Sequence, residues 1–223
     1  MALHAESSNR FQEVSDLLVH LKSIEPKQPS LSQEFLKFRA LKGLFFVHLY
    51  AAYEFTVHST IDRALSAIRE GAVPIKQLKP ELLALELDGR FRSVANTDGL
   101  NSWEKRWELL ERVESDEPTS LDVSALGPFL MNPNPRVLLA IWRLFCVNEE
   151  LFKEGKWQGR ITELLDNRNK VAHGRESATD VGGTFTVDDL RTRYDDINNF
   201  CLHFADTLAQ CIVSSGHIRT YPA

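Results

Sequence analysis

Residues 168–174 read Arg-Asn-Lys-Val-Ala-His-Gly and close a segment with helical periodicity. Over residues 161–172 the apolar side chains recur at the spacing of one helix face, and Arg168 falls on that same stripe. His173 lies roughly 140° around the helix from Arg168. Gly174 is the residue type that most often follows the end of a helix. The stretch therefore predicts a helix that carries Arg168 in its last turns and ends at His173.

The position of Arg168 on an apolar stripe has two explanations. Its side chain could snorkel to solvent or form an internal ion pair. Alternatively, the stripe faces a cleft or a subunit interface where an anion binds, because guanidinium groups suit carboxylates and phosphates. The residue spacing alone leaves both explanations open.

The composition fits one soluble domain with a substantial core. The chain has 223 residues, of which 43% are hydrophobic and 26% charged. It has no long uninterrupted apolar run and no secretory signal pattern, so we expect a cytoplasmic protein without membrane association. Cys146, Cys201 and Cys211 lack metal-ligand spacing and are expected to be reduced thiols.

Charge is unevenly distributed along the chain. The net charge of −5 argues against a protein that coats nucleic acid without selectivity. Residues 156–175 nevertheless carry an excess of positive charge, which suits contact with a few phosphates. The basic side chains are Lys156, Arg160, Arg168, Lys170 and Arg175, and the acidic ones are Glu163 and Asp166. The alternative is an ordinary solvated helix face.

Apolar periodicity and capping residues predict an all-α fold. We expect helices over about residues 8–24, 31–70, 80–87, 102–114, 135–145, 160–173 and 187–214. The chain is expected to be a single domain over residues 1–223, with a partly irregular helical insertion at about 72–134. Tryptophans in the insertion are expected in the core, and residues 176–183 are expected to form a polar loop.

Tyr50, Glu54 and His58 recur every four residues on the second helix and share one polar strip. Glu54 is either a solvated or ion-paired side chain, or a supporting residue that orients Arg168. A di-metal site would need a second, repeated Glu/His element, which the chain lacks. We therefore expect no metal.

The stretch at 164–174, LLDNRNKVAHG, resembles the R-x4-6-H motif of the HEPN superfamily of helical bundles, in which a polar residue often follows the arginine. It is most similar to stand-alone bacterial HEPN proteins associated with toxin–antitoxin and phage-defence loci. The resemblance implies a metal-independent endoribonuclease without a cofactor. Arg168, Asn169 and His173 would be catalytic, and Lys170 and Arg175 would bind RNA.

In such families two motif helices form one composite site across a homodimer, which would explain Arg168 on the apolar stripe. The resemblance also implies an antitoxin partner, such as a small nucleotidyltransferase. Two other functions compete with this one. The chain could be a non-catalytic HEPN module that binds a nucleotide or a protein, or a structural helical adaptor in which the motif is a coincidence.

Overall fold

The computed structural model describes residues 2–27 and 32–219, and the described chain is all-α, as the sequence predicts. No strand occurs within these ranges, and the two isolated β-bridges join Pro74 to Pro118 and Leu78 to Ile218. The helices are α1 (Ala2–Ser23), α2 (Gln33–Glu70), α3 (Pro80–Glu86), α4 (Asp88–Ala95), α5 (Gly99–Val113), α6 (Gly127–Leu130), α7 (Pro135–Leu144), α8 (Lys156–Ala172), α9 (Ala178–Gly183) and α10 (Val187–Val213), with 3-10 turns η1 (Ile75–Gln77) and η2 (Val123–Leu126). None of the described helices is both long enough and apolar enough to span a membrane.

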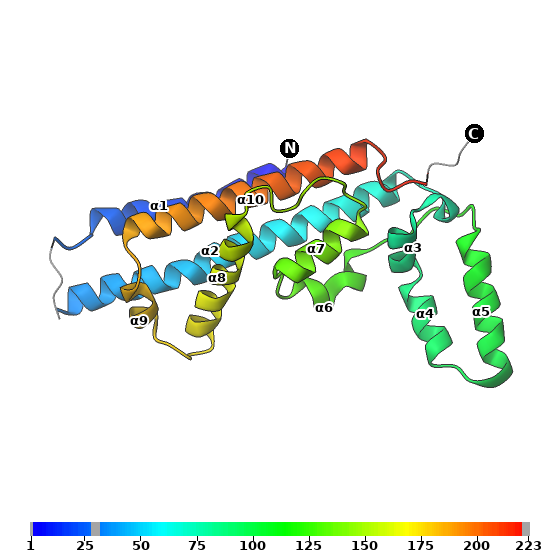
Figure 1. Ribbon diagram of the computed structural model, residues 1–223, viewed down its shortest axis with the longest axis horizontal. Coiled ribbons are helices and arrows are strands. Elements are labelled where there is room, and N and C mark those ends of the chain that lie inside the picture. Colours follow the sequence, from blue (N-terminus) through cyan, green and yellow to red (C-terminus); the bar gives the residue numbers. More distant parts are fainter. Residues whose placement is uncertain (1, 28–31, 220–223) are drawn as a thin grey trace. The chain divides into compact units, whose positions relative to one another are not determined.

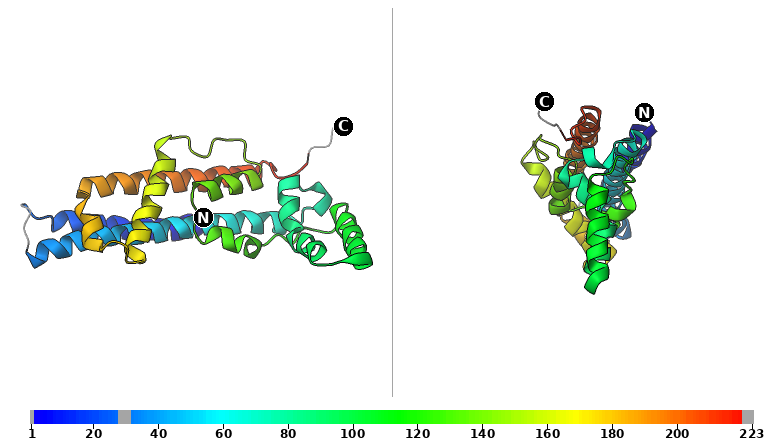
Figure 2. Two further views of the ribbon diagram at one scale, coloured as in Figure 1. Left: turned by 60° about the horizontal axis from the view of Figure 1, so that its bottom comes forward. Right: turned by 90° about the vertical axis from the view of Figure 1, so that its right-hand side faces the viewer.

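The chain divides into two compact units. The first contains residues 1–59, 132–136 and 150–205, and the second contains the remainder. In the first unit, α1 and the adjoining parts of α2 and α10 lie side by side, and α8 crosses them steeply (Figures 1 and 2). The rings of Tyr53 on α2 and Trp157 on α8 both contact Phe200 on α10, at centroid distances of 6.3 and 5.7 Å. These aromatic contacts hold α8 on the bundle.

Ion pairs also tie α8 to α10 within the first unit. Arg160 bonds the buried carboxylate of Asp196 at 2.9 Å, and Arg193 reaches Glu163 at the same distance. A buried carboxylate is stable only when its charge is compensated, so the Arg160–Asp196 pair fixes how α8 lies against α10.

The second unit contains α3, α4, α5 and α6, together with η1, η2 and the adjoining ends of α2, α7 and α10. Here α4 and α5 form a helical hairpin (Figure 1). The loop that follows α5 is anchored by Glu86, whose carboxylate accepts hydrogen bonds from the Thr119 hydroxyl at 2.7 Å and the Ser120 amide at 2.9 Å.

Several helix ends follow the sequence signals. Asn134 caps α7, since its side chain accepts from the Arg136 amide at 3.0 Å. Thr186 and Asp189 form the reciprocal capping box expected before α10, with bonds of 2.9 and 3.0 Å. The expected start of the second helix at residue 31 lies outside the described residues.

Other sequence expectations were wrong. The helix α1 begins at Ala2 rather than near residue 8, because the preceding residues include good helix formers. Residues 178–183 form α9 instead of a polar loop. There, Gly43 and Gly182 let the backbones of α2 and α9 approach so closely that a Cβ at either glycine would collide with backbone atoms of the other helix.

The insertion is more helical than expected, and its tryptophans are not in the core. Residues 88–95 form α4, between the expected helices at 80–87 and 102–114, and α5 begins at Gly99. Trp103 and Trp107 on α5 are 53% and 57% exposed. The two side chains lie on one face of α5, four residues apart, and the described chain does not cover that face.

Candidate functional site

The motif helix α8 ends in a Schellman motif. His173 is the C-cap residue, and Gly174 follows with a φ of +66°, a conformation that favours glycine. The amide of Gly174 donates to the carbonyl of Val171 at 3.2 Å, and the amide of Arg175 donates to that of Lys170 at 2.9 Å. The glycine therefore sets the point at which the chain leaves the helix, directly after His173.

Arg168 is half-buried, and two neighbours hold its guanidinium. The group lies over the ring of Tyr50 on α2, with 4.1 Å between the guanidinium carbon and the ring centroid. Its Nη1 donates to Oδ1 of Asn169 at 2.8 Å. In the described part of the chain, no carboxylate pairs with it. Both neighbours orient the cation and leave its charge unneutralised.

Tyr50 is buried and is itself fixed at its phenol end. The hydroxyl donates to Oε1 of Glu54 at 2.6 Å, and Oδ1 of Asn132 lies 3.5 Å from the same hydroxyl. Burial, followed by the hydrogen bond to Glu54, raises the pKa of Tyr50 well above its usual range, and the positive charge of Arg168 opposes that rise. The phenol thus stays neutral and acts as a donor and as a platform for the guanidinium.

Glu54 therefore reaches Arg168 through Tyr50. The sequence placed Tyr50 and Glu54 on one strip of α2, and the hydrogen bond between them agrees with that placement. Within residues 2–27 and 32–219, no ion pair joins Glu54 to Arg168. Any influence of Glu54 on the cation thus passes through the phenol.

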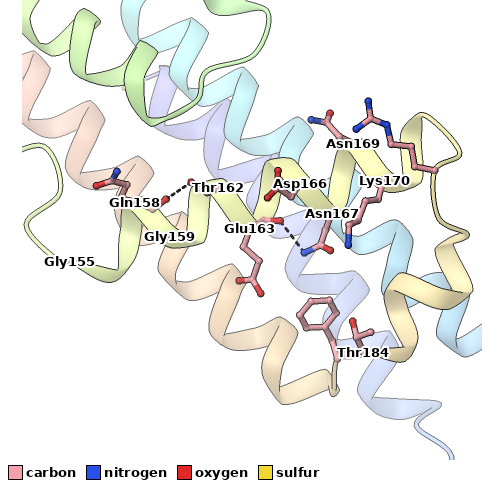
Figure 3. Close-up of a pocket in the computed structure, with 12 residues that line it drawn as sticks. Gly155, Gln158, Gly159, Thr162, Glu163, Asp166, Asn167, Asn169, Lys170 and Thr184 are labelled. Atoms are coloured by element: carbon pink, nitrogen blue, oxygen red, sulfur yellow. Dashed lines mark hydrogen bonds between the residues drawn. The ribbon is translucent and has the colours of Figure 1, made fainter.

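Asn169, Lys170 and Arg175 line an open groove of about 830 Å³. Side chains from successive turns of α8 form much of its wall, and Thr184 in the connection to α10 lies across from them (Figure 3). The acidic side chains Glu163 and Asp166 also line this groove, so its charge is mixed. The motif thus contributes one end of the groove.

Much of the positive charge expected on residues 156–175 is neutralised by carboxylates. Lys156 and Arg160 share Asp196, at 2.6 and 2.9 Å, and Lys170 pairs with Glu176 at 2.9 Å. The Lys170–Glu176 pair is solvent-exposed and therefore weak. Among the described residues, Arg168 and Arg175 have no carboxylate partner. The free positive charge is therefore concentrated in the motif.

His173 is exposed at the end of α8, whereas Arg168 packs back against α2. His173 follows Arg168 by five positions, which corresponds to about 140° of rotation and roughly 7.5 Å along the helix axis. The two side chains thus leave α8 in different directions. The structure places Asn169 beside Arg168 but does not bring His173 into the same cluster of contacts.

The described residues contain no group of three or more His, Cys, Asp or Glu side chains arranged to hold a metal ion. Cys146, Cys201 and Cys211 are free, and only Cys201 is fully buried. Burial raises the pKa of Cys146 to about 11.

Comparison with known proteins identifies the family. A family model described as RiboL-PSP-HEPN matches residues 5–210. The chain therefore belongs to this family of the HEPN superfamily, whose domains typically act as ribonucleases. Neither a curated protein nor a solved structure matches the chain.

Sequence reasoning missed the roles of two residues. Tyr50 was placed beside Glu54, but the contact of its ring with Arg168 depends on how α8 crosses α2. Asn132 belongs to the segment before α7, distant in sequence from both helices, and no local signal connects it to Tyr50. The Tyr50–Glu54 spacing of four residues was the available clue.

Proposed function

We propose that this protein is a metal-independent endoribonuclease of HEPN type. The observation that carries the proposal is the state of Arg168, a guanidinium that is held by Tyr50 and Asn169 yet paired with no carboxylate of the described chain. A fixed cation of this kind is what a developing pentacoordinate phosphate requires, because it needs no reorganisation during the reaction. Family membership makes RNA the expected substrate.

The proposed reaction uses the 2′-hydroxyl of RNA as its nucleophile. An imidazole of His173 removes the 2′-proton as the 2′-oxygen attacks the adjacent phosphorus. The bond from phosphorus to the 5′-oxygen breaks, and a protonated imidazole donates a proton to that leaving oxygen. The products are a 2′,3′-cyclic phosphate and a 5′-hydroxyl. Histidine suits both proton transfers because imidazole titrates near neutral pH.

Within this proposal, Arg168 stabilises the charge on the phosphate, and the Asn169 amide fixes Arg168 and can bond a phosphate oxygen. Lys170 and Arg175 bind neighbouring phosphates along the groove, with Lys170 exchanging Glu176 for RNA. Glu54 has a supporting role through its bond to Tyr50.

We infer that the active site forms between two copies of the chain. Arg168 and His173 leave α8 in directions about 140° apart, so one helix does not aim both at one phosphate. A two-fold axis near the end of α8 would bring a second arginine and a second histidine to the same place. It would also place two imidazoles near the scissile phosphate, where they can share the two proton transfers.

We further propose that residues 1–223 form one HEPN-like domain, with an insertion at about 72–134. The proposed biological role is that of a toxin in a toxin–antitoxin or phage-defence system. Its expected partner is an antitoxin such as a small nucleotidyltransferase. This role rests on the resemblance of residues 164–174 to such proteins.

The direct test uses an RNA oligonucleotide and a matched copy in which the nucleotide before the cut carries 2′-deoxyribose. We expect cleavage of the RNA with a cyclic phosphate end, activity that persists in EDTA, and no cleavage at the deoxy position. Activity that disappears with EDTA and returns with Mg²⁺ would contradict the mechanism. Binding of RNA without cleavage would favour the non-catalytic binding module.

Mixing Arg168→Ala with His173→Ala protein tests the composite site. If the composite site draws on both chains, a heterodimer keeps one arginine and one histidine in that site, so the mixture should regain part of the activity. Each variant alone lacks one of these two side chains in every site and should be far less active. A mixture that stays inactive, although exchange of subunits is demonstrated, would contradict a site shared in this way.

A further inference from the structure

The outer face of α5 carries a continuous apolar stripe. Leu100, Trp103, Trp107 and Leu110 are 83%, 53%, 57% and 62% exposed. The opposite side of α5 contains buried Ser102 and half-buried Leu109. The helix α5 therefore packs against the rest of its unit through the opposite side and not through the stripe.

The stripe is large for an apolar patch on the surface of a monomer. The two half-exposed indoles and the two leucines together present on the order of 500 Å² of apolar surface, near the upper end for the largest patch on a monomer. Two such stripes packed together would bury about 1,000 Å², which is where specific protein interfaces begin. A second identical stripe therefore has the right size to cover the first.

The spacing of the stripe is that of a coiled-coil seam. Apolar residues at 100, 103, 107 and 110 are separated by three, four and three residues, which places them at successive a and d positions of two heptads. In this register Arg106 occupies a g position, and Glu104 and Glu111 occupy e positions. One edge of the stripe is therefore basic and the other acidic.

This edge asymmetry selects the partner and its direction. In a parallel pair, the g position of one helix faces the e position of the next heptad on its partner, so Arg106 meets Glu111 of the second copy. In an antiparallel pair, like edges meet, which sets arginine against arginine and glutamate against glutamate. Within the described chain, Arg106, Glu104 and Glu111 take part in no ion pair, so they are available for such contacts.

Arg106 is already positioned beside the seam. Its guanidinium carbon lies 4.7 Å from the centroid of the Trp103 ring. This contact keeps the cation at the edge of the stripe. The acidic edge formed by Glu104 and Glu111 would repel the phosphates of a nucleic acid strand, which argues against RNA as the occupant.

From these observations we propose that α5 binds α5 of a second copy of this chain, in parallel, with Leu100, Trp103, Trp107 and Leu110 forming the seam. This contact is distinct from the pairing of motif helices proposed above. Its test needs neither RNA nor cleavage, so it succeeds or fails independently of the ribonuclease proposal.

Cysteine cross-linking tests the seam and its direction. Leu110 occupies a d position, and in a parallel pair it lies against Leu110 of the partner, whereas in an antiparallel pair it lies against Leu100. We expect Leu110→Cys protein to form covalent dimers under mild oxidation. Asn101→Cys is the matched control, because residue 101 is exposed but lies off the stripe. The unsubstituted chain controls for Cys146, Cys201 and Cys211.

Sedimentation of charge variants gives a second, non-covalent measurement. Arg106→Glu should weaken self-association measurably, and the combination of Arg106→Glu with Glu111→Arg should restore it. Trp103→Ala with Trp107→Ala should weaken it by about thirtyfold or more, as expected for central aromatic residues. Absence of the Leu110→Cys cross-link, or no rescue by the double charge swap, would overturn the proposal. So would loss of RNA binding with unchanged self-association in the tryptophan variant.

Discussion

Tyr50 offers a test of how Arg168 is held, because two substitutions separate its ring from its hydroxyl. Tyr50→Phe keeps the ring beneath the guanidinium and removes the bond to Glu54. Tyr50→Leu removes the ring as well. If the ring orients Arg168 for phosphate stabilisation, Tyr50→Leu should lose activity and Tyr50→Phe should keep most of it.

The geometry sets the size of the expected effect. The guanidinium carbon lies 4.1 Å from the ring centroid, and Arg168 is half-buried. Cation–π contacts are weaker at exposed sites than at desolvated ones, so this half-buried contact should contribute roughly 1–2 kcal/mol. If this contribution acts mainly in the transition state, its loss lowers kcat/KM by about five- to thirtyfold.

Stability must be measured beside activity, because Tyr50 is only 2% exposed. Tyr50→Leu leaves a cavity and should cost about 2–4 kcal/mol of unfolding free energy. Tyr50→Phe loses one hydrogen bond and should cost about 1 kcal/mol. RNA cleavage is therefore assayed well below the melting temperature of each variant.

A double-mutant cycle with Arg168→Ala distinguishes a local role from a general loss of structure. In the Arg168→Ala background, Tyr50→Leu should have little further effect on cleavage, because the contact is already absent. Equal losses from Tyr50→Leu in both backgrounds would refute the reasoning. So would a folded Tyr50→Leu protein with wild-type activity.

Three further predictions concern the end of α8, the groove and the second unit. Gly174→Ala should destabilise the protein by about 1 kcal/mol because of its positive φ, whereas Gly159→Ala, in open space within α8, should stabilise it by about 0.5–1 kcal/mol, as read from thermal melts. Equal shifts in both would contradict the helix-end geometry. Lys170→Ala and Arg175→Ala should each reduce the slope of log affinity for RNA against log salt by about one, and unchanged slopes would remove these residues from the interface. Burial lowers the folded-state pKa of His217 below 6.5, so the unfolded imidazole takes up a proton at a higher pH than the folded one. Stability should therefore fall as the pH drops below about 6.5, and His217→Leu should flatten that dependence in melts taken across this range.

Much of the fold could be predicted because its signals are local. The helix caps at Asn134 and Thr186 and the glycine at residue 174 act within a few residues of themselves, so sequence identifies them directly. Whether Trp103 and Trp107 are buried could not be predicted from local signals. Periodicity shows that they share a face, but not whether another part of the chain covers that face.

The arrangement of the candidate site could be predicted only in part. The sequence names Arg168, Asn169 and His173 as candidates, and the structure joins Arg168 to Asn169 but not to His173. The spacing of four residues placed Tyr50 beside Glu54, and a hydrogen bond joins them. The contact between Tyr50 and Arg168 could not be predicted, because it depends on the crossing of α2 by α8, more than a hundred residues later in the chain. Neutralisation of Arg160 by Asp196 was missed for the same reason.

The central claim is that His173 transfers a proton during RNA cleavage, and one comparison tests it most directly. His173→Ala protein is compared with His20→Ala, a matched change of another exposed histidine, in the last turn of α1. Both should melt as the unsubstituted protein does. His173→Ala should cleave RNA about 10²–10⁴-fold more slowly, with His20→Ala unaffected. A well-folded His173→Ala protein that cuts RNA at the unsubstituted rate would contradict the ribonuclease mechanism.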